Sequence, residues 1–170
     1  MSLHIIPHTH NKIPSFKRWD FFMLEIVPVK ISEHFDETRK LSALHWRETE
    51  SEFSDRPPEL DIQTYQTLEA QNLIIAFAAI SDGEIVGYVS GFLSRHPHYD
   101  QLIAQHDLLF IHPAHRAGRS GLKLMREFEL AAKEAGAKKV LYHAKPGSNF
   151  AKLLERLQFQ QEEIIFQKGL

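Results

Sequence analysis

A turn of small and basic residues joins an apolar strand to an amphipathic helix in the second half of the chain. It consists of Arg116, Ala117, Gly118, Arg119, Ser120 and Gly121. The first amide groups of a helix have no partner inside the helix, and the helix dipole adds partial positive charge there. Small residues let an anion approach those amides, and two arginines add charge. The pattern predicts a phosphate site, although a tight connection with two incidental arginines would look the same.

Two common nucleotide-binding motifs are absent from this turn. It lacks the Gly-Lys-Ser/Thr run of an ATP-binding P-loop. It also lacks the extended glycine spacing of a dinucleotide-binding fold. A phosphate bound here would therefore belong to another class of ligand.

The segments before the turn predict a strand, two helices and a β-hairpin. Phe21–Lys30 is rich in β-branched and aromatic residues, and helix formers follow over about 33–50 and 61–72, with Ser32 as an N-cap. Two apolar runs then predict antiparallel strands joined by Asp82-Gly83, a dipeptide that suits a two-residue hairpin. These runs are Leu73–Ser81 and Glu84–Leu93.

The turn itself lies between a predicted strand at Gln105–Ile111 and a helix from about Ser120 to Ala135, which Gly136 ends. One face of that helix carries Leu124, Phe128, Ala131 and Ala135. The remaining elements are a strand at Ala137–His143, a helix capped by Ser148-Asn149 that reaches Leu157, and a last strand at Phe159–Gln167.

The predicted order is β-α-α-β-β-β-α-β-α-β. In it, an antiparallel meander passes into a strand–turn–helix–strand unit that pairs in parallel. The fold class is therefore α/β with a mixed sheet (α+β) and helices on both of its faces.

Length and composition predict one domain. The chain has 170 residues, of which residues 21–170 carry the domain pattern, whereas residues 1–20 show no sustained periodicity and are interpreted as an N-terminal extension. His4, His8 and His10 in that extension lack a rigid frame, so no metal site is expected. A net charge of −2 argues against nucleic acid or an anionic membrane as the main partner. The absence of cysteine excludes disulfides and thiolate nucleophiles and favours a cytoplasmic protein.

The strand, turn and helix together resemble motif A of the GNAT superfamily of acetyl-CoA-dependent N-acetyltransferases. That motif is usually written Arg/Gln-x-x-Gly-x-Gly/Ala after a strand ending in Val-x-Pro, and Ile111-His112-Pro113 with Arg116–Gly121 matches it in place. The resemblance covers Leu24–Lys168, and Leu153–Phe159 is similar to the family's Leu-Tyr-Glu-Lys-Leu-Gly-Phe. In texture the turn is closest to small phage-encoded members, which implies a host cytoplasm.

Three residues depart from the family pattern. Arg119 stands where the motif has its first glycine, which modifies phosphate binding without abolishing it. Leu154 stands where many members place a tyrosine that protonates the departing thiolate, so the usual general acid is missing. Gln158 replaces the glycine before the last phenylalanine.

The resemblance implies that acetyl-CoA is the co-substrate and that no metal takes part. The pyrophosphate would sit on Arg116–Gly121, and the pantetheine arm would bond to the backbone of Leu109, Phe110 and Ile111, where the sheet splays. Asn149 is also expected to contact acetyl-CoA. An amine would then attack the thioester directly, without a covalent enzyme intermediate.

Three side chains are candidates for the proton transfers. The family's usual basic glutamate would fall on Gln105, which cannot accept a proton. Asp107 is two residues further, on the same face of the strand, and is the first candidate for the base; His106 points to the other face. His143 is a second candidate, and Tyr142 could replace the missing phenol if it faces inward. An ordinary packing or pairing role stays open for each.

The distribution of charge bears on the acceptor. Residues 116–152 carry nine Lys or Arg and three Glu, whereas residues 31–72 carry ten Asp or Glu and four Lys or Arg. In this fold the acidic part would form the entrance to the acceptor site, which favours a cationic amine. Two solvated helix surfaces would give the same distribution of charge. The amine itself stays open, from polyamine to protein N-terminus. So do a homodimer, which many relatives form, and a non-catalytic GNAT-fold module that binds CoA or a protein.

Overall fold

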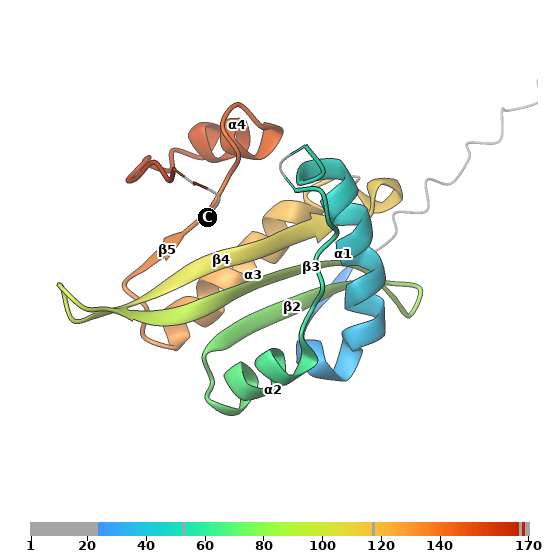
Figure 1. Ribbon diagram of the computed structural model, residues 1–170, viewed down its shortest axis with the longest axis horizontal. Coiled ribbons are helices and arrows are strands. Elements are labelled where there is room, and N and C mark those ends of the chain that lie inside the picture. Colours follow the sequence, from blue (N-terminus) through green and yellow to red (C-terminus); the bar gives the residue numbers. More distant parts are fainter. Residues whose placement is uncertain (1–23, 53, 117, 167, 169–170) are drawn as a thin grey trace, which may run out of the picture.

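The computed structural model describes residues 24–52, 54–116, 118–166 and 168 (Figure 1). The predicted extension at residues 1–20 lies outside the described residues, as do residues 21–23 of the first predicted strand. The elements are β1 (Glu25–Pro28), the 3₁₀ turn η1 (Ile31–His34), α1 (Phe35–Thr49), α2 (Ile62–Ala70), β2 (Ile74–Ser81), β3 (Glu84–His96), β4 (Gln101–Ile111), the 3₁₀ turn η2 (Pro113–His115), α3 (Ser120–Glu134), β5 (Lys139–Leu141) and α4 (Asn149–Arg156).

The five strands form one mixed sheet in the order β1-β2-β3-β4-β5. The first four pair antiparallel, and β5 pairs in parallel with β4, which confirms the predicted meander and parallel unit. Asp82 and Gly83 join β2 to β3 with positive φ angles of 52° and 82°. Both residues tolerate that conformation, so the two-residue hairpin forms where the sequence predicts it.

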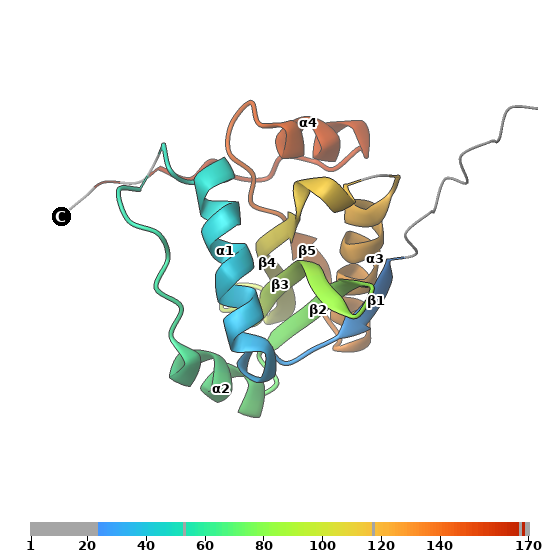
Figure 2. The same ribbon diagram turned by 90° about the vertical axis from the view of Figure 1, so that its right-hand side faces the viewer.

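Helices cover both faces of the sheet (Figure 2). On one face α3 packs Leu124, Phe128 and Ala132 against the strands, and all three are fully buried. The sequence also places Ala131 and Ala135 on the buried face, and this part of the prediction is wrong. The buried face of α3 includes Met125 and Ala132 instead, and Ala135 is the exposed C-cap.

The opposite face is covered by α1, α2 and η1. Leu41 of α1 packs with Tyr88 and Phe110, and Tyr65 of α2 packs with Ile31 and Ala76. The predicted helices on both faces are therefore confirmed.

No helix among the described residues combines the length and the apolar character that a membrane crossing requires.

Ser32 does not cap α1. It lies inside η1, where its amide and hydroxyl donate to the Glu69 carboxylate at 3.1 and 2.5 Å. The helix instead begins after His34, which makes no side-chain cap. The N-cap prediction at Ser32 was wrong because a partner distant in the sequence, on α2, takes its hydroxyl. The cap predicted for α4 is confirmed, since the Ser148 hydroxyl accepts from the Ala151 amide at 3.1 Å.

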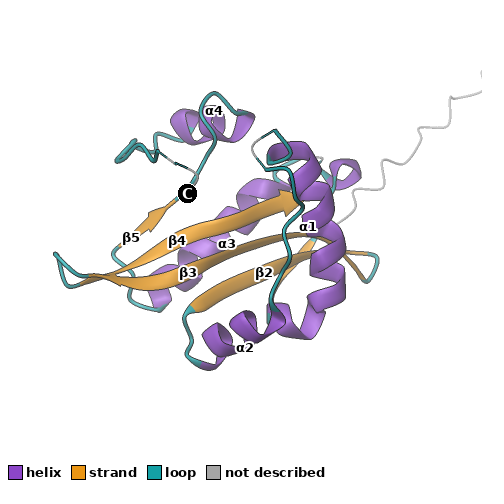
Figure 3. Cartoon of the chain, in the orientation of Figure 1, coloured by secondary structure: helices purple, strands orange, loops and turns teal. Residues whose placement is uncertain are grey.

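The predicted last strand at Phe159–Gln167 is wrong. Phe159–Phe166 pairs with no strand and is drawn as loop in Figure 3, while Gln167 lies outside the described residues. Positive φ at Gln158 turns the chain after α4, and the Phe159 ring contacts Tyr142 edge-on at 5.4 Å. The three-residue strand β5 offers a short ladder, so contacts between side chains hold this segment in place of strand pairing. At the end of this segment the side chains of Ile164, Ile165 and Phe166 stay 67%, 74% and 89% exposed.

Candidate functional site

Half of strand β4 has an open edge. Strand β5 pairs with β4 only at Ile103–Gln105, and within the described chain no strand lies on that edge from His106 onward. On the other edge β3 stays paired as far as Ile111, and the His112 amide donates to the Val86 carbonyl at 2.7 Å. Peptide groups alternate in direction along a strand, so those of Leu109 and Ile111 point toward the open edge.

A β-bulge at Asp107 changes the pleat of β4. Ser90 of β3 pairs with Leu108 and the next residue, Gly91, pairs with His106, so Asp107 is the extra residue. Before the bulge Leu102 and Ala104 pack toward α3, and after it Leu109 and Ile111 do so. Leu108 and Phe110 instead pack on the α1 side. Strand alternation therefore assigns faces separately before and after Asp107.

The bulge lies beneath the ring of Phe128. A β-carbon at Gly91 would come within 2.4 Å of the Gln105 carbonyl oxygen and 2.5 Å of Phe128 Cζ. Only glycine leaves room there for both the α3 ring and the neighbouring strand. The position of Asp107 thus depends on close packing between α3, β3 and β4.

Arg116 is fully engaged with protein groups. Its Nη1 and Nη2 donate to the two carboxylate oxygens of Glu48 on α1 at 2.6 and 2.7 Å. Its Nε donates to the Ile111 carbonyl at 2.7 Å, and its guanidinium lies 5.2 Å from the ring centre of Phe110. The Arg116 hydrogen bonds lower the pKa of Glu48. The predicted phosphate ligand therefore joins α1 to the end of β4.

The remaining turn residues form the start of α3. Gly118 adopts a φ of +72°, Arg119 is exposed in the N-cap position, and Ser120 is buried. A β-carbon at Gly121 would meet nothing within 4 Å, so the space beside that amide is open. Ala117 lies outside the described residues. The turn thus keeps the helix N-terminus that the sequence predicts for an anion.

Asp107 lies near two phenols and an imidazole. Its charge contributes to a raised pKa for Tyr65, about 12, and for Tyr88, in both cases after burial. Although Asp107 as a residue is exposed, burial of its carboxyl group raises its pKa, and the nearby His143 opposes that shift. The charge of His143 therefore acts on Asp107, the first candidate for the base.

The other candidate acid and the predicted α4 contact lie at different places. The Tyr142 hydroxyl donates to Glu129 Oε1 at 3.1 Å and also lies 3.4 Å from the Met125 carbonyl, so it is directed at α3. Burial and the Glu129 charge raise its pKa. Asn149 is the first residue of α4 and is exposed.

His106 is the most isolated polar side chain near the open edge. It is 5% exposed, and within the described chain neither ring nitrogen has a hydrogen-bond partner. Its ring lies against Tyr142 and Phe150, with centroids 5.2 and 5.6 Å away. Burial lowers its pKa to about 3, helped by the charges of His143 and His45. Leaving a buried polar group unpaired costs about 1–3 kcal/mol.

Sequence reasoning missed the site contributions of Tyr65, Glu48 and His45. His45 lies 5.0 Å from Phe110 in a stacked arrangement, and its Nδ1 is 3.2 Å from the Tyr88 hydroxyl. None of the three belongs to a local motif, so only long-range contacts reveal them. Within the described residues, no group of three His, Asp or Glu side chains is placed to hold a metal ion.

Comparison with known proteins agrees with the geometry. A sequence profile of the acetyltransferase (GNAT) family matches residues 38–159, well over half of the chain. No curated protein is detectably similar in sequence.

Several solved structures share the fold. An aminoglycoside acetyltransferase, HMB0005, from an uncultured soil metagenomic sample superposes with a TM-score of 0.70 at 17% identity, covering 86% of this chain and 98% of its own. The ribosomal-protein-alanine N-acetyltransferase of Brucella melitensis biovar Abortus 2308 gives a TM-score of 0.68 at 19% identity, with 86% and 99% covered. AAC(6')-Iy, solved with the bisubstrate analogue CoA-S-monomethyl-acetylneamine, gives 0.66 at 17%, with 86% and 98% covered. With its open-edged β4, its helix-terminal turn and the profile match, the chain belongs to the GNAT family of acetyltransferases.

Proposed function

We propose that the protein transfers an acetyl group from acetyl-CoA to a primary amine by direct attack on the thioester. The observation that supports this most directly is the open edge of β4 from His106 to Ile111, which leads straight to the N-terminus of α3. On that edge the Ile111 carbonyl already accepts from Arg116, so the peptide groups of Leu109 are the ones that suit the amides of a pantetheine arm, and the turn suits its pyrophosphate.

In this proposal the turn binds phosphate mainly through its backbone. Arg116 already donates to Glu48 and Ile111, so the first contacts fall on the amides of Gly118–Gly121 and on the exposed side chain of Arg119. Asn149, the exposed first residue of α4, is the further proposed contact of the arm. The residues present therefore fit acetyl-CoA.

Asp107 is the proposed base. The amine nitrogen forms a bond to the thioester carbonyl carbon, its proton passes to Asp107 directly or through a water, and the carbon–sulfur bond then breaks. The raised pKa of Asp107 brings its basicity closer to the working pH than that of an ordinary carboxylate. His143 is the second candidate for carrying that proton and for returning one to the thiolate. Tyr142 is the weaker choice for that acid, since its hydroxyl is bonded to α3.

The acceptor is proposed to be a cationic small molecule. Asp107 faces the buried phenols of α2 and β3, and α1 and α2 belong to the acidic part of the chain. Two ion pairs neutralise part of that charge, Glu48 with Arg116 at 2.6 Å and Glu50 with Lys145 at 2.9 Å. Structural neighbours include proteins named as aminoglycoside acetyltransferases, which supports the class of acceptor.

The alternative is a GNAT-fold module that binds CoA or a protein without turnover. Gln105 in place of the usual glutamate and Leu154 in place of the usual tyrosine favour it. Calorimetric titration of the purified chain with acetyl-CoA and with dephospho-CoA comes first. A screen of amines for acetylation then separates the two functions. If folded protein does not bind acetyl-CoA, the proposed function is wrong.

Gly121→Asp tests the phosphate site with opposite effects on folding and binding. An added carboxylate at the N-terminus of α3 should keep or raise stability by roughly 0.3–1 kcal/mol, because the helix dipole favours it. The same charge should weaken acetyl-CoA binding by at least about tenfold, by repelling the pyrophosphate. Calorimetry and thermal unfolding measure the two effects.

The matched control is Gln63→Glu, which adds a negative charge at the corresponding position of α2. It should leave affinity unchanged, and Gly121→Ala should do little because open space surrounds that site. Equal affinity in Gly121→Asp and the wild type would place the phosphates elsewhere.

Glu48→Gln tests whether Arg116 also serves the donor. The amide removes the negative charge and one of the two acceptor oxygens, which frees at least one guanidinium donor. Acetyl-CoA should then bind roughly 2- to 5-fold more tightly, the size of a partly exposed ion pair. Calorimetry at two salt concentrations measures the gain, which should shrink at high salt. Glu52→Gln removes the same charge outside this pair and serves as the control. Weaker binding in Glu48→Gln would instead mean that Arg116 acts only by holding Ile111 and α1.

A further inference from the structure

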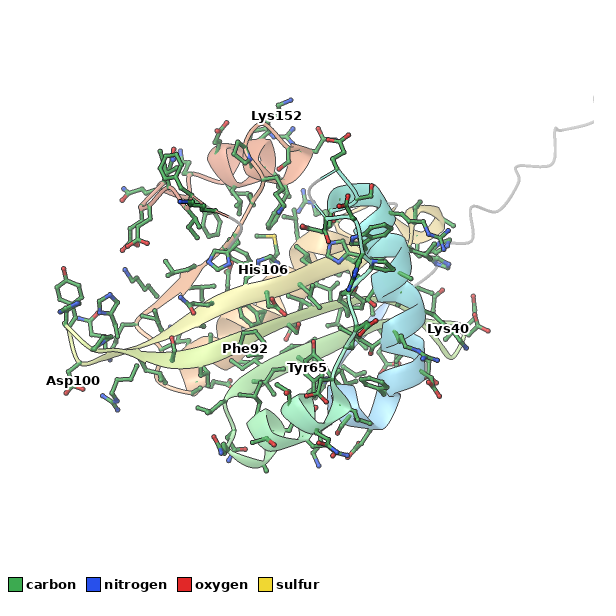
Figure 4. All side chains as sticks on the ribbon, viewed as in Figure 1. Lys40, Tyr65, Phe92, Asp100, His106 and Lys152 are labelled. Atoms are coloured by element: carbon green, nitrogen blue, oxygen red, sulfur yellow. The ribbon has the colours of Figure 1, made fainter. Side chains whose placement is uncertain are left out.

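His106 lies at the point where β4 and β5 separate. Gln105 and Leu141 form the last pair between these strands, and His106 is the next residue of β4. Its ring faces Tyr142 just beyond β5 and Phe150 of α4, on the edge of β4 toward those elements in Figure 4. The side chain thus closes the inner end of the open edge.

The direction of the donor places its acyl end there. This step rests on the proposed function, in which the phosphates bind at the turn after Ile111 and the arm runs back along β4. Ile111 lies five positions after His106, about 17 Å at 3.4 Å per residue. The reactive end of the arm therefore reaches the region of His106 and Asp107.

The imidazole of His106 is suited to bond there without changing charge. Side chains around the ring bury both of its nitrogens, and neither nitrogen has a hydrogen-bond partner among the described residues. A pKa lowered to about 3 keeps the ring neutral at working pH, with one nitrogen donating and the other accepting. A buried polar group without a partner suggests one supplied from outside.

We propose that His106 donates its ring N–H to the carbonyl oxygen of the acyl donor and stabilises the negative charge that develops on it. As the amine nitrogen bonds to the carbonyl carbon, the carbonyl electron pair moves to that oxygen. Collapse restores the C=O bond and expels the thiolate, while the amine proton goes to Asp107. His106 keeps its own proton throughout and acts as an oxyanion donor.

The first test is nitrogen-15 NMR of the histidine rings in the full chain. The chain has eleven histidines, and the His106 signals are assigned by their loss in His106→Phe. Adding acetyl-CoA should shift the His106 ring signals, whereas the exposed His98 should not change. If acetyl-CoA binds by calorimetry and the His106 signals do not move, this inference is wrong while the proposed function stands. If acetyl-CoA does not bind the folded protein, both fall.

The second test is kinetic. His106→Phe keeps a ring but no donor, and should lower kcat by roughly 10²- to 10³-fold with little change in the KM for acetyl-CoA. His106→Gln restores an N–H and should turn over at least about tenfold faster than the phenylalanine variant. The pH profile of His106→Phe should keep the wild-type shape, since a neutral donor contributes no ionisation. Equal rates in the Phe and Gln variants, both folded, would overturn the proposal.

Discussion

Asp107→Asn is expected to lower kcat by roughly 10²- to 10⁴-fold while acetyl-CoA affinity stays nearly unchanged. Asparagine keeps the size of the side chain but cannot accept the amine proton. The variant should fold as well as the wild type or better. Because burial raises the pKa of Asp107, its charged form is the less stable one in the folded state, and an uncharged amide removes that cost. Rate assays, calorimetry and thermal unfolding separate these effects.

The raised pKa of Asp107 also predicts how the rate and the stability depend on pH. The base form is needed, so kcat/KM should rise with pH through a value above the usual 3.8 of an aspartate. Asp107 favours folding below its unfolded-state pKa, and that contribution is lost as pH rises through the folded-state pKa. Asp107→Asn should abolish both the acidic limb of the rate and this part of the stability profile.

Asp82→Asn is the matched control, since it makes the same change at the distant hairpin turn, where asparagine tolerates the positive φ. It should leave the rate unchanged. A full rate in Asp107→Asn would pass the role of base to His143, whose alanine variant is then measured. If neither substitution alters turnover, the base lies elsewhere.

Phe128→Ala should lower the free energy of unfolding by roughly 3–5 kcal/mol. The ring is fully buried and packs over Gly91 at the β-bulge. Its removal leaves a cavity that the sheet cannot close without moving β3 or β4. Natural domains have only about 5–15 kcal/mol in all, so the variant should be marginally folded at 37 °C.

Urea denaturation measures this loss, with Leu130→Ala on the same helix as the control. Leu130 is 43% exposed, and its replacement should change stability by less than about 1 kcal/mol. A loss in Phe128→Ala no larger than in the control would contradict the packing described for α3. A variant that folds but loses activity would support the dependence of Asp107 on this ring.

Local patterns were sufficient for most of the fold. Two apolar runs and the Asp82-Gly83 turn predicted the hairpin, and the turn at Arg116–Gly121 predicted the open helix N-terminus. The strand predicted at Phe159–Gln167 was misleading, because apolar and aromatic residues do not report whether a partner strand is long enough to pair. Ser32 failed as a cap for a similar reason, since its partner Glu69 lies 37 positions away.

In the candidate site, too, the sequence predicted some residues and not others. Asp107 was chosen from its place two residues after Gln105 and His143 as a titratable group near it, and in the structure the charge of His143 acts on the Asp107 carboxyl. The pairing of Arg116 with Glu48 was not predictable, since any exposed carboxylate on α1 reads alike in sequence. The isolation of His106 was also hidden, because strand alternation gives the side a residue faces but not whether its nitrogens find partners.

The bulge at Asp107 makes β4 sensitive to chain length. Because one extra residue reverses the pleat, Leu102 and Ala104 share a face with Leu109 and Ile111, positions that differ in parity. Deleting a single residue here would turn the second half of the strand over and expose its apolar side chains. A homologue that loses one residue here therefore has to change the pairing of β4 with β3, whereas a substitution at an exposed position of the strand leaves that pairing intact.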